Sequence, residues 1–243
     1  MSRTASDPGT TAFEGFSRAG VQFLADLAEH NDRTWFQPRK GDYERLLKEP
    51  LERLCVALDA AFAARGVPLS ADPSRSPFRI YRDVRFARDK SPYKTNVGAS
   101  FAFVERDADG IPVAGAGAAR RGGGYFHLAP GEIFVGGGMW HPDPAPLAAW
   151  RALVRSDAGL VHAAIDDPSF AARFGEVDGD RLRRPPAGVP ADHPDLALLV
   201  LKDVTFGRRL DDREAFSPEL PRILADDLAT AAPLLRLLAS LEG

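Results

Sequence analysis

Cysteine and long apolar runs are scarce in this chain. Its 243 residues include 1 cysteine and 2 methionines. The lone Cys55 excludes a disulfide within the chain, which fits a reducing cytoplasm. No run approaches the roughly 18 apolar residues that a membrane-spanning helix needs. We therefore expect a cytoplasmic protein with no membrane partner.

The first eleven residues also lack an apolar run. Residues 1–11 are polar and include Pro8 and Gly9, so no signal peptide is indicated. We expect a disordered tail there. The rest of the chain has no repeat and no break in composition, which predicts a single α+β domain over residues 12–243.

Metal-ligand and nucleophile patterns are likewise missing. The 5 histidines have no ligand spacing and no cysteine beside them, so we expect no metal site and identify no cofactor. No GxSxG sequence occurs. Residues 115–122 are rich in glycine but lack the phosphate-loop signature, which favours a flexible insertion.

Positive charge is concentrated in one segment of an acidic protein. Residues 79–96 hold six cations and two anions, a net charge of +4, whereas the whole chain is −3, so the remainder sums to −7. A basic segment in an acidic chain indicates a surface that meets an anion. A coat protein for nucleic acid would instead be basic overall.

Hydrophobic periodicity predicts helices at both ends of the chain. Ser17 is expected to cap a helix that runs to about Glu29, and Gly66 to end a later one. Further helices are expected near 146–156 and 160–165, and Ser217–Pro218 marks the start of a last long helix that Pro233 kinks.

The middle of the chain alternates with a period of two residues, as strands do. Four strands are expected, followed by a short extended piece near 201–206 that rejoins the sheet. The four are residues 78–86, 97–104, 125–128 and 133–140, with 107–124 as a long loop. The expected fold class is therefore α+β, with N-terminal helices, a central antiparallel β-meander and C-terminal helices.

Strand geometry places the basic segment beside small residues. If 78–86 is a strand, the side chains of Arg79, Asp83 and Arg85 leave the same face, about 7 Å apart. Small residues on the next strand leave room for a positively charged groove, which suits a phosphate or carboxylate. The candidate ligand-binding residues are Arg79, Arg82, Arg85, Asp89, Lys90, Tyr93, Lys94, Trp140 and Arg208.

Two side chains are candidates for proton transfer if the groove is catalytic. Asp83 lies among the arginines, and His127 alternates with Tyr125 on an expected strand. A structural, hydrogen-bonded role for His127 is an alternative. The residues do not decide whether the protein is an enzyme.

Two other functions stay open. The arginines and lysines can form an internal ion-pair network with Asp83 and Asp89 in a non-catalytic structural or interaction module. Alternatively, Tyr93 and Trp140 stack on bases while lysines follow phosphates, as in a nucleic-acid-binding protein. The oligomeric state is not indicated.

Several sequence motifs resemble a widespread family of uncharacterised bacterial and fungal proteins. The core of the resemblance is RDVRFARDKSPYKTN (82–96), which has the form RDxRFxxDKxPYK. The other matching motifs are FEGF (13–16), NDRTWF (31–36), YFHL (125–128), GGGMWHPDP (136–144), HPDLALLVLKDVTFGRR (193–209) and APLLRLL (232–238). The resemblance implies a shared fold and ligand surface but no reaction. Thr34 stands where the resemblance leads us to expect an acidic residue.

Overall fold

The computed structural model describes residues 12–85, 87–107 and 122–241. The fold begins with helices. Helix α1 (Arg18–Glu29) starts at Ser17, whose hydroxyl oxygen accepts a hydrogen bond from the Gly20 N–H at 3.1 Å. Helix α4 (Glu49–Arg65) ends at Gly66, where a left-handed φ of 63° favours a residue without Cβ. Both predicted helix ends are confirmed.

Shorter helices join α1 to α4, and others follow the sheet. Before α4 these are α2 (Arg33–Phe36), a 3-10 turn (Gln37–Arg39), α3 (Lys40–Tyr43) and a π-helical turn (Glu44–Lys48). After the sheet begins they are α5 (Pro144–Ser156), α6 (Ala158–Ile165), α7 (Pro168–Phe174), α8 (Leu196–Leu199), α9 (Asp212–Ala215), α10 (Leu220–Thr230) and α11 (Ala232–Ser240). The expected last helix is thus two helices, because Pro233 begins a new one.

Five strands form one antiparallel sheet in the order β1-β2-β3-β4-β5. They are β1 (Leu69–Ser70), β2 (Val97–Phe103), β3 (Gly123–Ala129), β4 (Glu132–Met139) and β5 (Val204–Arg209). The predicted meander and the α+β fold class are confirmed. No periodic signal marks β1, because a two-residue strand is too short to alternate.

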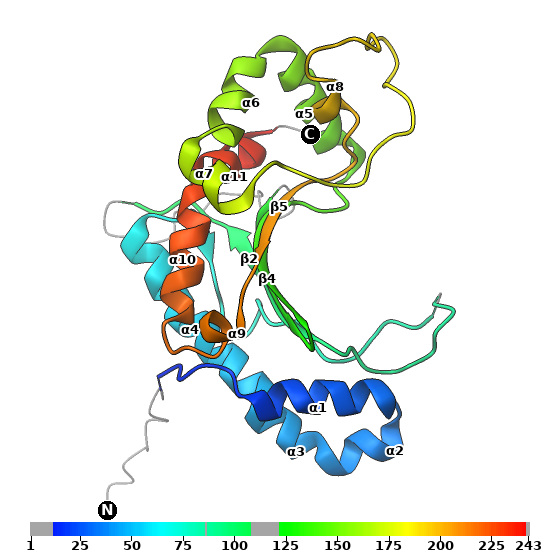
Figure 1. Cartoon of the computed structure of the whole chain (residues 1–243), viewed down its shortest axis with the longest axis vertical. Coiled ribbons are helices and arrows are strands. Elements are labelled where there is room, and N and C mark those ends of the chain that lie inside the picture. The colour runs from blue at the N-terminus through cyan, green and yellow to red at the C-terminus, as the bar shows by residue number, and fades with distance from the viewer. Residues whose placement is uncertain (1–11, 86, 108–121, 242–243) are drawn as a thin grey trace, which may run out of the picture.

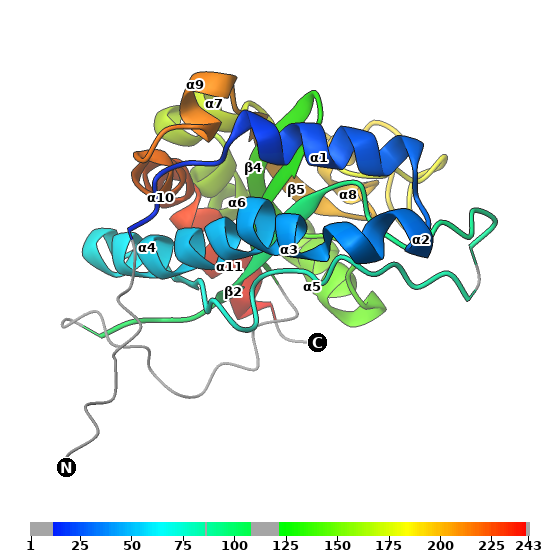
Figure 2. The same cartoon turned by 90° about the horizontal axis from the view of Figure 1, so that it is seen from below.

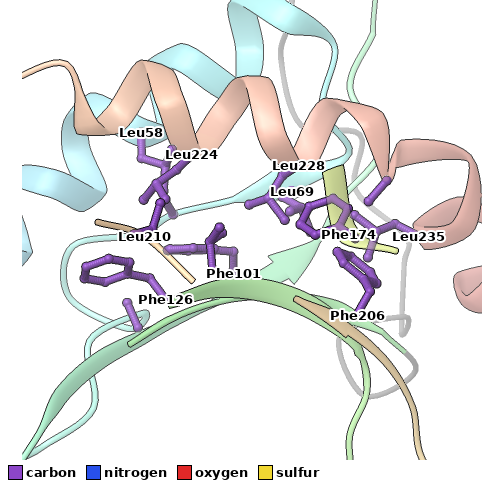
Figure 3. Packing of buried hydrophobic residues seen from close by; sticks show 14 of the residues in the cluster. Leu58, Leu69, Phe101, Phe126, Phe174, Phe206, Leu210, Leu224, Leu228 and Leu235 are labelled. Carbon is purple, nitrogen blue, oxygen red and sulfur yellow. The ribbon is translucent and has the colours of Figure 1, made fainter. Parts of the chain in front are cut away.

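Helices cover one face of the curved sheet and leave the other face open. Helices α4 and α10 lie on the convex side, while α1 and α3 lie beside each other at one end of the sheet (Figures 1 and 2). Phe101, Phe126 and Phe206 of the sheet point towards Leu224 and Leu228 of α10 (Figure 3). Burial of these apolar side chains holds the helices on the sheet.

The expected strand over 78–86 is wrong. Residues 77–85 and 87–96 instead form an irregular arm, tied to itself by an isolated bridge between Tyr81 and Tyr93. The arm packs on helix α2 through Tyr93, and its remainder projects beyond the helices (Figure 1). Alternation alone does not make a strand, and Pro92 has no N–H to donate to a ladder. We call residues 77–96 the arm.

Two other predictions remain untested. The tail over 1–11 and nearly all of the loop over 107–124 lie outside the described residues. One buried cluster runs from Phe13 to Leu241, and the single-domain organisation stays a prediction. In the part of the chain that is described, no helix is both long and apolar enough to cross a membrane.

Candidate functional site

The open face of the sheet carries small residues in its middle and a groove above them. Two cross-strand rows lie there, Ser100–Tyr125–Gly136–Gly207 and Ala102–Gly123–Gly138–Thr205. Because most of these side chains are small, the face retains a groove of about 1400 Å³ that both rows line. The sequence-based expectation of free space above the sheet therefore agrees with the structure.

Lys94 lies at the end of the groove next to the arm. Its ammonium nitrogen is 5.0 Å from the centre of the Phe78 ring, a cation–π contact. Partial burial lowers the pKa of Lys94, and the nearby charge of Arg79 lowers it further. Lys94 lines the groove, whereas Arg79 lies outside it, exposed on the arm.

His127 lies on the groove floor, where its ring stacks on Phe134 with the ring centres 4.8 Å apart. The Tyr125 hydroxyl lies 3.0 Å from Nδ1 of His127, and the Asn96 amide nitrogen 3.4 Å from it. If both donate, Nδ1 carries no proton and Nε2 does. Within the described residues Nε2 has no hydrogen-bond partner, and the closest carboxylate oxygen, on Glu132, is 3.9 Å away.

The environment of His127 favours the neutral imidazole. Burial lowers its pKa, and the charge of Glu132 opposes that shift only in part. Burial also raises the pKa of the Tyr125 hydroxyl. Near neutral pH the pair is therefore a neutral phenol beside a neutral imidazole, which can accept a proton.

Asp83 also lines the groove, but Arg85 engages its carboxylate. Arg85 donates to the two carboxylate oxygens at 3.0 Å and 2.6 Å. These hydrogen bonds hold the pKa of Asp83 below its usual range. A paired carboxylate of low pKa is a poor proton acceptor, so His127 has the better chemistry of the two candidates.

Three more predicted residues stabilise the arm. Arg82, which lines the groove, forms an ion pair with Asp89 across the arm. Ser91 donates to Asp89 through its hydroxyl at 2.6 Å and its N–H at 2.9 Å, and with Arg82 it holds the Asp89 pKa well below its usual range. Lys90 donates to the Val84 carbonyl oxygen at 2.9 Å. Asp89 and Lys90 do not line the groove.

Two other predicted residues, Tyr93 and Arg208, do not line the groove. Tyr93 is 1% exposed, and its ring stacks on Phe36 at 4.1 Å, so it belongs to the core. Arg208 lies on the helix-covered side of β5, within 2.7 Å of Glu214 and 2.6 Å of Asp227. These contacts favour the ion-pair interpretation for Arg208.

Trp140 lies at the other end of the groove and is 75% exposed. The next residue, His141, has a left-handed φ of 46° without being glycine. Its N–H donates to the buried carboxylate of Asp203 at 2.6 Å, and Asp203 also accepts from the Asp180 N–H at 3.3 Å. The turn after β4 is thus fixed from inside the protein.

The groove as a whole is mixed in charge, not uniformly basic. Its lining includes three cations (Arg75, Arg82, Lys94) and four anions (Asp72, Asp83, Glu176, Asp178). The excess of positive charge predicted from residues 79–96 lies on the arm beside the groove. No group of acidic, histidine or cysteine side chains suited to a metal ion occurs among the described residues.

Three groove residues were not among the candidate site residues predicted from the sequence: Tyr125, Phe78 and Asn96. Tyr125 shares a face with His127, so their spacing of two on a strand was an available signal. Phe78 begins the expected strand 78–86, which does not form, and its side chain is 42% exposed. Asn96 approaches His127 only through the β2–β3 register, which no local pattern indicates.

The fold and the groove define an α+β protein whose curved antiparallel sheet is covered, as far as the described residues show, by helices on one face. A model of a family described as conserved hypothetical protein (DUF2461) matches residues 19–236. The chain belongs to this family, which confirms the resemblance to uncharacterised proteins. No curated protein and no solved structure matches the chain significantly.

Proposed function

We propose that the groove binds a small anionic molecule, phosphorylated or carboxylated, at the end where Lys94 lies. The observation that carries the proposal is the environment of that ammonium group. It is partly buried against Phe78, and within residues 12–85, 87–107 and 122–241 no carboxylate is in ion-pair range of it. A desolvated charge without a counter-charge is unfavourable, and an incoming anion relieves that cost.

Arg79 strengthens the attraction for an anion. It lies close enough to Lys94 to lower the pKa of that side chain. Two neighbouring cations bind a phosphate or carboxylate better than one, and the planar guanidinium adds bidentate geometry. Arg82 and Arg85 contribute less because Asp89 and Asp83 already neutralise them.

In a catalytic form of this proposal, Tyr125 and His127 move a proton. A bound ligand gives a proton to the Tyr125 oxygen while the phenolic proton passes to Nδ1 of His127. The resulting imidazolium faces Glu132, whose carboxylate lies 3.9 Å from Nε2. Asp83 then acts only as a fixed negative charge at the groove wall.

A thermal-shift titration with pyrophosphate and citrate tests the binding proposal. We expect the melting temperature to rise with ligand concentration, as linkage requires. Lys94→Met is expected to abolish the rise, whereas the matched control Lys48→Met, on a helical surface, is expected to retain it. Equal responses of the two variants would contradict the proposal.

Nucleic-acid binding is a second candidate. It is supported by the exposed rings of Phe78 and Tyr81 on the basic arm and of Trp140 at the other end of the groove, since bases stack on such rings. Affinity for a single-stranded oligonucleotide should then fall steeply with salt. A flat salt response would exclude this candidate.

A further inference from the structure

We propose that the groove holds an elongated acid, with a flat ring of the ligand stacked on Trp140 and the anionic group at Lys94. This inference rests on the proposed function, which concerns only the anionic group of the ligand. It adds the ring at the opposite end of the ligand. It assigns Trp140 a role as a stacking surface, and it sets the length and the class of molecule that the site accepts.

The first observation is the exposure of the indole. Trp140 is 75% exposed, whereas Trp150 is fully buried. Trp140 also lines the groove, so its ring meets the space where a ligand lies. A large apolar ring kept in solvent at the lip of a groove marks an interaction site.

The second observation is that buried groups fix the position of this ring. His141 adopts a φ of 46°, a left-handed conformation that is strained for a residue with a Cβ. The buried carboxylate of Asp203 holds the turn through the His141 N–H. The His141 ring also meets the Trp140 ring edge-on, with the centres 4.3 Å apart. Strain of this kind is found where the position of a side chain matters.

The third observation is the length of the groove floor along β4. Phe134 and Trp140 lie six residues apart on or directly after β4, which corresponds to roughly 20 Å along an extended strand. Gly136 and Gly138 lie between them on the same face and line the groove. Along β4, therefore, the floor between Phe134 and Trp140 has only glycines on this face.

An aromatic base and a sugar ring both present a flat, partly apolar face to an indole. The shared chemistry is a ring with an apolar face, joined to an acidic group by an extended linker. Three probes separate the sources: tripolyphosphate has no ring, ATP has an aromatic base, and a phosphorylated maltotriose has only sugar rings.

Calorimetric titration of the three probes into the full chain tests the inference. We expect at least one ring-bearing probe to bind about tenfold more tightly than tripolyphosphate, as one stacked ring supplies. Trp140→Ala is expected to remove this difference and leave tripolyphosphate binding unchanged. The exposed position of Trp140 makes that variant suitable, because little packing is lost.

Fluorescence gives a second readout. In a Trp35→Phe background, where Trp140 is the exposed indole and Trp150 the buried one, the ring-bearing probe is expected to quench emission. His141→Gly relieves the left-handed strain, so it should raise the melting temperature while reducing the preference for a ring-bearing probe. If the turn has only a structural role, His141→Gly should change the melting temperature and leave the preference for a ring-bearing probe unchanged.

The outcomes distinguish the inference from the proposed function. Lys94-dependent binding of all three probes with equal affinity, or a ring preference that survives Trp140→Ala, would overturn the inference alone. Binding that needs Trp140 but not Lys94 would overturn the proposed function. Failure of every probe to bind would overturn both.

Discussion

The ammonium nitrogen of Lys94 lies 5.0 Å from the centre of the Phe78 ring, and both side chains line the groove. The ring stabilises the charged form, while burial and Arg79 lower the pKa of Lys94. Phe78→Leu keeps the apolar volume and removes the π face, so it should lower that pKa further. An NMR titration of Lys94 measures the shift.

Phe134→Leu is the matched control for this prediction. Phe134 lies on the same groove floor but stacks on His127, so its replacement should leave the Lys94 titration unchanged. An unchanged pKa in Phe78→Leu would show that the ring does not stabilise the ammonium group.

The buried ion pair under the sheet should dominate stability. Asp227 is fully buried, its carboxylate lies 2.6 Å from Arg208, and burial raises its pKa against the effect of that pairing. Asp227→Asn leaves Arg208 without its buried counter-charge and is expected to cost about 3–5 kcal/mol in the free energy of unfolding. Urea denaturation measures this cost.

An exposed arginine provides the comparison. Arg222 forms ion pairs with Glu219 and Asp226 on the surface of α10, and Arg222→Met should leave the free energy of unfolding almost unchanged. Similar costs for the two changes would show that the buried network does not stabilise the fold.

His162 should make stability depend on pH. Its Nδ1 lies 2.8 Å from Asp166 and its Nε2 2.7 Å from Asp195, and these hydrogen bonds raise its pKa above 6.5. The contribution of His162 is therefore fully present below pH 6.5 and is lost as pH rises through the folded pKa. The stability difference between wild type and His162→Gln should shrink over that interval.

Thermal unfolding of both proteins at several pH values from about 5.5 to 8.5 checks this. His30→Gln, which removes a histidine that forms no ion pair with a described residue, should show no such trend. A constant difference between wild type and His162→Gln across the range would contradict the prediction.

Gly138 is required at the end of β4. Its φ is 112°, and a Cβ there would lie 2.1 Å from the Val204 carbonyl oxygen. Gly138→Ala is expected to cost more than about 2 kcal/mol, because strand β5 must move away. Gly41→Ala, in a helix with no atom within 4 Å of the added Cβ, should instead stabilise by about 0.5–1 kcal/mol. Equal effects in denaturation would contradict this account.

Helix starts and helix ends could be predicted from the sequence, because each depends on the chemistry of one or two neighbouring residues. Ser17 satisfies helical N–H groups and Gly66 adopts a left-handed turn, and these requirements are visible in the sequence. The strand at 78–86 was wrong because pairing depends on a neighbour, and Tyr81 meets only Tyr93 in an isolated bridge.

The candidate site could be predicted in part, because alternation along a strand shows which side chains lie on the same face of the sheet. Alternation places His127 on the same face as Tyr125, and both residues line the groove. Arg208 illustrates the limit: its partners Glu214 and Asp227 come from α9 and α10, and no local pattern indicates which sheet face these helices cover. Tyr93 enters the core for the same kind of reason, by packing on Phe36.

The most direct test is the titration of the Lys94 ammonium group by NMR with and without saturating pyrophosphate. Without the anion its pKa should lie below the ordinary value of 10.5. We predict that pyrophosphate raises this pKa, because a bound anion stabilises the charged form. An unchanged Lys94 pKa in the presence of pyrophosphate would contradict anion binding at this end of the groove.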